Sequence, residues 1–163
     1  MGKSIQYFKK GDVIRTTPEK GFWGIAVVLN AGQKKEIAPG KMSCPLCHIL
    51  ITPLLFQHEV TFSEINPADL SVLIFEEFAK RSDGARIPWR VKTCIDIYTN
   101  RNKANLAVIG NIDPSSLYSE QLIFHPLEDR FFLCGDVKSD LGREAYIDFM
   151  RKSENGEHCK IIR

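Results

Sequence analysis

Apolar and polar residues alternate near the start of the chain in a pattern that predicts β-strands. The segments Asp12–Thr17 and Phe22–Asn30 are rich in β-branched and aromatic residues, and the turn residues PEKG separate them. We therefore predict a β-hairpin. A longer apolar run, CPLCHILITPLLF, begins at Cys44. Because proline cannot donate a ladder hydrogen bond, we expect a buried strand that starts near Leu46 and bends or ends at Pro53.

Two later segments carry the signals of amphipathic helices. Asn66 is a suitable N-cap, a proline follows it, and apolar residues then recur with helical spacing, which predicts a helix over Pro67–Lys80. A second helix is predicted over Leu141–Lys152, with Asp140 as its cap. The remaining strand-like segments are Trp89–Tyr98, Asn105–Gly110, Gln121–Phe124 and Arg130–Val137.

These elements predict a single α+β domain over residues 1–163, in which a curved, mostly antiparallel β-sheet packs against two α-helices. No internal repeat or linker divides the chain. A composition of 44% hydrophobic and 26% charged residues is typical of a globular protein. A chain of this length buries about 70% of its unfolded surface, which is enough for a core without disulfides.

Charge and targeting signals limit the partners that we expect. The N-terminus MGKSIQYFKKGD lacks the apolar core of a signal peptide, and no window approaches the roughly 18 apolar residues of a membrane span. We therefore expect a cytoplasmic protein with no membrane partner. The net charge is +2, from 22 basic and 20 acidic residues, which provides no overall field to attract nucleic acid. An electrostatic partner must be bound by a local patch.

The segment CPLCH has the spacing of a c-type haem site, half a zinc site or a redox dithiol. Haem attachment is ordinarily a process of exported proteins, and no export signal is present. Zinc on Cys44 and Cys47 needs two more ligands, and the candidates are scattered: Cys94, Cys134, His58, His158 and Cys159. Because free cysteine packs as a small hydrophobe, we expect both sulfurs to fill the core, and we predict no metal and no cofactor. A zinc site on Cys44 and Cys47 is the alternative.

Sequence signatures of catalysis are absent, so we predict that the protein is not an enzyme. None of the four histidines lies in an HExxH context, and no GxSxG elbow or glycine-rich phosphate loop occurs. Basic and aromatic residues do interleave between Arg86 and Lys103, and such a stretch can stack on bases and neutralise phosphates. A small RNA-binding protein is therefore a second alternative, although the near balance of charges makes nucleic acid a less favoured partner.

Two segments resemble parts of a group of bacterial immunity proteins. Within Lys9–Asn30, a Gly-Asp start leads a strand, a short turn follows, and a second strand carries an aromatic residue and a glycine ahead of an aliphatic run. The matching positions are Gly11, Asp12, Gly21, Phe22, Trp23, Gly24 and Val27–Leu29. Asn105–Pro126 is similar to the closing part of the same group, with an aliphatic strand that ends in Ile109 and Gly110.

The resemblance implies an antitoxin of a polymorphic-toxin or contact-dependent growth inhibition system. Its partner would be a cognate protein toxin, the C-terminal domain of a large secreted protein, whose active site it blocks in the cytoplasm. Such an inhibitor needs a surface of roughly 800 Å² with aromatic and arginine anchors. If the toxin is a nuclease with a basic cleft, acidic residues steer the association. The residues expected at this surface are Glu76, Glu77, Asp83, Arg86, Trp89, Glu128, Asp129, Asp136 and Asp140.

Overall fold

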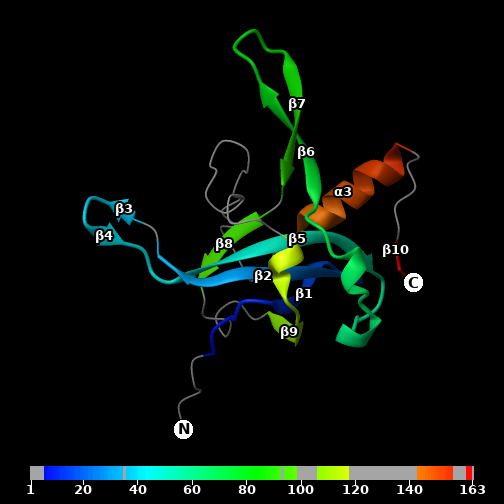
Figure 1. The fold of residues 1–163 in the computed structure, drawn as a ribbon. Helices are drawn as coiled ribbons and strands as arrows, with labels where there is room; N and C mark the ends of the chain where they lie inside the picture. The colour runs from blue at the N-terminus through cyan, green and yellow to red at the C-terminus, as the bar shows by residue number, and fades with distance from the viewer. Residues whose placement is uncertain are drawn as a thin grey trace.

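The computed structural model of the chain describes residues 6–34, 36–92, 94–98, 106–117, 143–155 and 161–162. Within these ranges the main element is a six-stranded sheet in the order β10-β5-β2-β1-β9, with β8 also paired to β5 (Figure 1). Its strands are β1 (Asp12–Glu19), β2 (Phe22–Gln33), β5 (Leu46–Phe56), β8 (Cys94–Tyr98), β9 (Ala107–Asn111) and β10 (Ile161–Ile162). Every pairing is antiparallel except that of β10 with β5. The predicted mostly antiparallel sheet is confirmed.

Two small hairpins project from this sheet in different directions (Figure 1). One pairs β3 (Glu36–Ala38) with β4 (Lys41–Met42), and the other pairs β6 (Ile74–Lys80) with β7 (Arg86–Lys92). Among the described residues, each of these strands pairs only with its own hairpin partner. Short 3₁₀ turns lie at η1 (Phe62–Glu64), η2 (Pro67–Asp69) and η3 (Pro114–Ser116).

The described residues contain one α-helix, α3 (Arg143–Glu154), so the prediction of two helices is wrong. The helix predicted over Leu141–Lys152 is α3, and its proposed cap Asp140 lies outside the described residues. The helix predicted over Pro67–Lys80 does not form. The Asn66 side chain does accept a hydrogen bond from the backbone of Ala68 at 3.1 Å, but it caps only the 3₁₀ turn η2.

The segment after η2 forms β6 because it has a cross-strand partner that lies farther along the chain. Residues Ile74–Lys80 are rich in aromatic and β-branched side chains, which suit a strand as well as a helix face. Each of them pairs with a residue of β7. Pairing with the next segment of the chain overrides a local helical pattern, and a short apolar segment does not distinguish the two periods.

The other strand predictions are confirmed in part. The β1–β2 hairpin forms, and both strands extend beyond the predicted bounds. β9 corresponds to the strand predicted at Asn105–Gly110. The segment Trp89–Tyr98 is divided between β7 and β8, which belong to different sheets. The strands predicted at Gln121–Phe124 and Arg130–Val137 lie outside the described residues.

β5 begins at Leu46 as predicted but continues through Pro53 to Phe56. The β2–β5 register shifts at this point, which accommodates the proline in a bulge, and Pro53 itself is exposed. The Thr52 hydroxyl donates to the backbone carbonyl oxygen of Ile25 at 2.7 Å. The Thr52 side chain thus supplies a hydrogen-bond donor next to Pro53, which has no backbone N–H.

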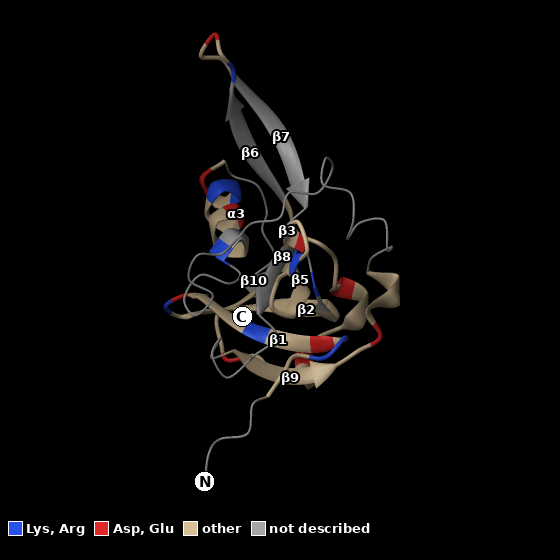
Figure 2. Cartoon of the chain, turned by 90° about the vertical axis from the view of Figure 1, so that its left-hand side faces the viewer, with Lys and Arg blue, Asp and Glu red and all other residues tan. Residues whose placement is uncertain are grey.

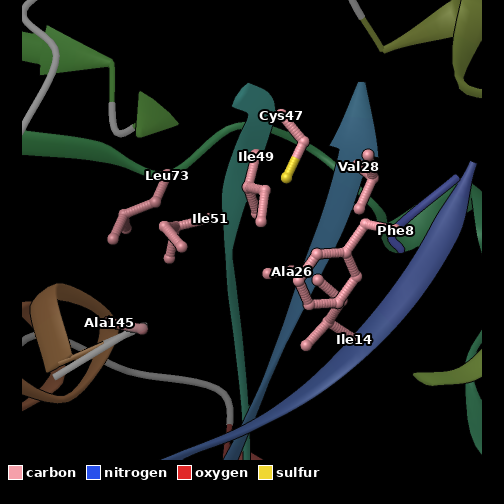
Figure 3. Packing of buried hydrophobic residues seen from close by; sticks show 9 residues of the cluster. All are labelled: Phe8, Ile14, Ala26, Val28, Cys47, Ile49, Ile51, Leu73 and Ala145. Carbon is pink, nitrogen blue, oxygen red and sulfur yellow. The ribbon is translucent and has the colours of Figure 1, made fainter. Parts of the chain in front are cut away.

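The main sheet is buried on both faces, which explains the unbroken apolar runs. Alternate residues of β1 and β2 point to opposite sides, so Ile14, Ala26 and Val28 belong to one core cluster. Figure 3 shows this cluster with Leu73 and Ala145 beside β5. The opposite cluster consists of Val13, Ile25, Val27, Phe56, Val60, Ile65 and Leu70. Its last three residues come from the segment that follows β5, so this segment covers the second face.

Candidate partner interface

The structure places five of the nine expected partner residues in the β6–β7 hairpin. Glu76 and Glu77 lie on β6, Asp83 lies in the connecting turn, and Arg86 and Trp89 lie on β7. Residues that are up to thirteen positions apart in sequence are therefore brought together by one short hairpin. The other four, Glu128, Asp129, Asp136 and Asp140, lie outside the described residues.

Local chemistry explains the turn at the end of this hairpin. The backbone N–H of Gly84 donates to the carbonyl of Arg81 at 2.9 Å, and the N–H of Arg81 donates to the carbonyl of Ala85 at 2.9 Å. Gly84 has a φ of 83°, a left-handed conformation that favours glycine. The Asp83 carboxylate accepts the N–H of Ala85 at 2.9 Å. An SDG sequence between two strand-like segments is the signal that predicts this hairpin.

The base of the hairpin is attached to the main sheet. One residue before β6, the backbone N–H of Leu73 donates to the carbonyl of Ile51 on β5 at 2.8 Å. Leu73 is buried in the core cluster, whereas Ile74 is 47% exposed. The helix α3 also contacts β6. The hairpin is therefore anchored at one end, and the transition from core to surface occurs at the first residue of β6.

The hairpin is net basic, whereas the sequence predicted a mainly acidic partner surface. Residues 74–92 contain five basic residues, Lys80, Arg81, Arg86, Arg90 and Lys92, against three acidic residues. The helical interpretation of Pro67–Lys80 concealed this arrangement, because it separated the acidic residues of β6 from the basic residues of β7. Lys80 was missed for that reason, whereas Arg90 and Lys92 belong to the basic stretch that the sequence suggested for RNA binding.

Comparison with protein-family models, with curated proteins and with solved structures gave no significant match to this chain. Within the part of the chain that the structure describes, no helix has the length and apolarity that a membrane crossing requires.

Among the described residues outside the hairpin, charged residues of both signs are interspersed, as Figure 2 shows for Lys and Arg against Asp and Glu. An open cleft with a volume of about 410 Å³ lies beside the β1–β2 turn, and it is lined by both signs of charge, Glu19 as well as Lys20 and Arg143. A second groove of about 410 Å³, beside Tyr7 and Pro45, is mainly apolar.

The two cysteines of CPLCH have different environments. Cys47 is fully buried in the core cluster beside Ile49 and Val28 (Figure 3), whereas Cys44 is exposed ahead of β5. The expectation that both sulfurs fill the core therefore holds for Cys47 and is wrong for Cys44. Neither cysteine forms a disulfide, and the described residues contain no group of three or more His, Cys, Asp or Glu side chains placed to hold a metal ion.

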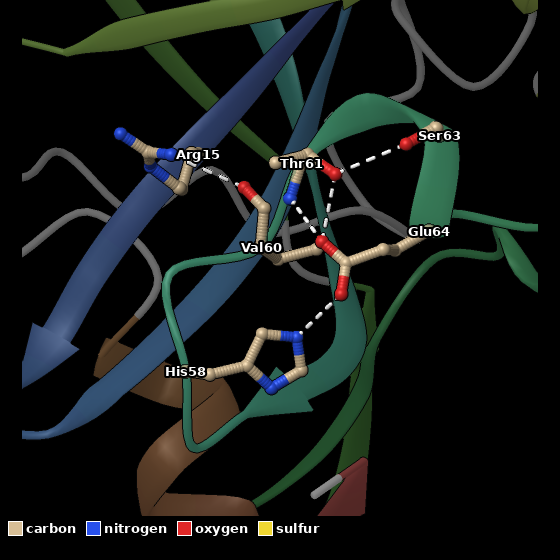
Figure 4. A network of polar contacts seen from close by, with 6 residues as sticks. All are labelled: Arg15, His58, Val60, Thr61, Ser63 and Glu64. Carbon is tan, nitrogen blue, oxygen red and sulfur yellow. Dashed lines mark hydrogen bonds and ion pairs between the residues drawn. The ribbon is translucent and has the colours of Figure 1, made fainter.

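A polar network connects His58, Thr61 and Glu64 (Figure 4). The Glu64 carboxylate accepts the N–H and the hydroxyl of Thr61, each at 2.7 Å, and lies 2.7 Å from Nε2 of His58. The hydrogen bond from the Thr61 backbone, followed by those from the Thr61 hydroxyl and from His58, lowers the pKa of Glu64 to about 2. Nearby, Arg15 on β1 donates to the carbonyl of Val60 at 3.1 Å.

This network stabilises a loop and does not have the geometry of a nucleophilic triad. In a triad the histidine lies between the hydroxyl and the carboxylate, so that it can accept the hydroxyl proton. Here the Glu64 carboxylate lies between His58 and Thr61, as in a capping box at the start of η1. The network, with Arg15, holds in place the segment that covers the second face of the sheet.

Proposed function

We propose that the protein is an immunity protein, which binds a cognate toxin domain in the cytoplasm and blocks its active site without catalysing a reaction. The observation that carries this proposal is the β6–β7 hairpin. It projects from the main sheet and includes five of the expected partner residues (Figure 1). A two-stranded hairpin is at best marginally stable in water by itself, so burial against a partner would stabilise it.

The rest of the fold supports this role as a scaffold. The main sheet is buried on both faces, and the core clusters hold β5, from which the chain reaches the hairpin through Leu73. A rigid support lowers the entropy that is lost when a surface binds. Arg86 and Trp89 are of the residue types that most often dominate binding energy, and they lie on the same strand.

The direct test is binding of the toxin domain that is encoded beside the protein. We expect a complex with nanomolar or lower Kd between the chain and the C-terminal domain of the adjacent large secreted protein, measured by calorimetry. Arg86→Ala should weaken binding by about 2 kcal/mol or more. The matched control is Lys41→Ala, an exposed basic residue of the β3–β4 hairpin, which should leave Kd unchanged. Failure of the unmodified chain to bind the adjacent domain would remove the proposal.

Neither of the two alternatives gains support from a specific observation. The stretch from Arg86 to Lys103 does not lie on one element, since Arg86 belongs to the projecting hairpin and Tyr98 to the main sheet, and Lys103 lies outside the described residues. For zinc, Cys44 is exposed and Cys47 is buried in an apolar cluster.

A further inference from the structure

The cross-strand register of the β6–β7 hairpin gathers basic positions on one face. Lys80 pairs with Arg86, Glu76 pairs with Arg90, and Lys92 pairs with the first residue of β6. Paired residues of antiparallel strands share a face, and so do residues two apart on one strand. These positions therefore lie on a single face, which carries four basic residues and one acidic residue. We call Lys80, Arg86, Arg90 and Lys92 the cationic face.

The other face of the hairpin is different in composition. The register places there the pairs Phe75 with Val91, Glu77 with Trp89 and Ala79 with Ile87. Five of these six positions are apolar. The alternation along the two strands thus separates the basic positions from the main apolar positions, which is the arrangement of an amphipathic hairpin.

The pair of Lys80 and Arg86 is unfavourable in an isolated hairpin. Like charges directly opposite each other on neighbouring strands repel, whereas opposite charges stabilise a pairing. Arg81 follows immediately, and its Nε lies 3.6 Å from Oδ2 of Asp83, the carboxylate of the turn. Both of these side chains are more than half exposed. Lys80 and Arg86 are therefore cross-strand neighbours in this register. The carboxylate of Asp83 lies near Arg81 instead.

We propose that the cationic face docks on an acidic surface of the partner protein. This inference rests on the proposed immunity function and reverses the partner chemistry that the sequence suggested, because it requires acidic rather than basic groups on the toxin. Opposite charge on the partner would relieve the repulsion between Lys80 and Arg86, and it would raise the association rate by electrostatic steering.

A protein fits this face better than a nucleic acid does. Glu76 lies on the cationic face, and Glu77 and Asp83 lie in the same hairpin, so this surface is mixed in charge and suits a partner with discrete acidic groups better than a continuous phosphate backbone. The pair of Phe78 and Pro88 lies on the same face between the basic positions. Protein interfaces combine apolar area of this kind with arginine, whereas nucleic-acid surfaces are dominated by phosphate contacts.

The test uses the full chain with two defined probes, a fluorescein-labelled poly-glutamate peptide and a poly-uridine RNA of equal length. The variant is Lys80→Gln/Arg86→Gln, and the matched control is Lys34→Gln/Lys41→Gln, which removes two exposed charges next to and within the β3–β4 hairpin. We expect the unmodified chain to bind the peptide more tightly than the RNA. The hairpin variant should lose about tenfold in peptide affinity, and the control less than about twofold.

Several results would overturn the inference: no binding of the peptide, tighter binding of the RNA, or equal losses in variant and control. A melting temperature equal to or above that of the unmodified chain shows that the hairpin variant is folded, as expected when the repulsion between Lys80 and Arg86 is removed. The same variants are then titrated with the adjacent toxin domain. If the domain binds the unmodified chain and Lys80→Gln/Arg86→Gln equally well, the cationic face is excluded and the immunity function stands. If the domain does not bind at all, the immunity function fails, and the peptide and RNA results decide the inference.

Discussion

Replacing Thr52 with valine is expected to destabilise the fold, mainly through the loss of its buried hydrogen bond to Ile25 and also through the loss of a longer one, 3.4 Å, from the Leu54 N–H. Thr52 is fully buried on β5, and its hydroxyl donates to the carbonyl oxygen of Ile25 at 2.7 Å. The next residue, Pro53, has no N–H to donate. The β2–β5 register passes from Gly24 to Ala26 at this point, so Ile25 has no directly paired residue on β5. The Thr52 hydroxyl therefore takes the role that a backbone donor has elsewhere in the sheet.

The magnitude follows from the acceptor that the substitution leaves behind. Valine is close to threonine in shape, so the packing around Thr52 changes little. A buried acceptor without a donor costs about 1–3 kcal/mol, and a value of about 2 kcal/mol is the central expectation. For a chain of this size, each 1 kcal/mol lowers the melting temperature by about 2–4 °C. We therefore expect Thr52→Val to lower the melting temperature by about 4–8 °C.

Urea unfolding followed by circular dichroism measures this loss directly. The midpoint should fall while the slope m stays constant, because the surface exposed on unfolding is the same. Thr17→Val on β1 is the control, since Thr17 is exposed and the same chemical change there should alter stability by no more than about 0.5 kcal/mol. A Thr52→Val protein as stable as the unmodified chain would refute the role assigned to this hydroxyl in tolerating the proline.

Three further predictions concern single sites. Because the pKa of Glu64 is lowered from 4.5 to about 2, its contribution to stability is present above pH 4.5 and is lost as the pH falls toward 2; the difference in melting temperature between the unmodified chain and Glu64→Gln should shrink over that range, and a constant difference would count against it. Cys44 should react rapidly with a thiol reagent in the folded protein, while Cys47 reacts only after unfolding; mass spectrometry of the labelled peptides would expose the reverse order. Gly11→Ala should lower the melting temperature strongly, because Gly11 has a φ of 86° and an added Cβ would lie 2.0 Å from the carbonyl oxygen of Ile112; an unchanged melting temperature would contradict this geometry.

The parts of the fold that the sequence predicted well are those in which local signals and tertiary contacts agree. The β1–β2 hairpin is an example: two segments of strand-forming residues flank a turn that contains Gly21, which has a φ of 81°. The start of β5 is another, because the proline at position 45 interrupts pairing and Leu46 begins the apolar run. In both cases the information lies within about ten residues of the element that it determines.

The failures occur where a partner outside the segment decides the structure. The segment Pro67–Lys80 has a capping residue, a first-turn proline and apolar residues at helical spacing, yet its second half becomes β6 because β7 supplies a matching strand. Of the two outcomes expected at Pro53, a bulge forms and β5 does not end, because Thr52, one residue earlier, supplies a donor to another strand. Neither effect can be predicted from a sequence segment that contains only one of the two interacting parts, β6 without β7 or Thr52 without Ile25.

Several residues of the candidate interface were predicted from the sequence, but the charge of the hairpin that carries them was not. Five expected residues do lie together in the hairpin, but the sequence assigned Arg90 and Lys92 to an RNA-binding stretch and gave Lys80 no role at a partner surface. The charge of a face depends on the register of two paired strands, and a helical interpretation of Pro67–Lys80 contains no such register. The excess of basic residues follows only from the pairing.

Hydrogen–deuterium exchange of the chain with and without the adjacent toxin domain tests the central claim most directly. If the β6–β7 hairpin is the docking element, residues 74–92 gain protection in the complex, while the β3–β4 hairpin at residues 36–42, which also projects from the sheet, keeps its free exchange rate. Protection that appears at residues 36–42 or elsewhere on the sheet, with none at residues 74–92, would contradict the account.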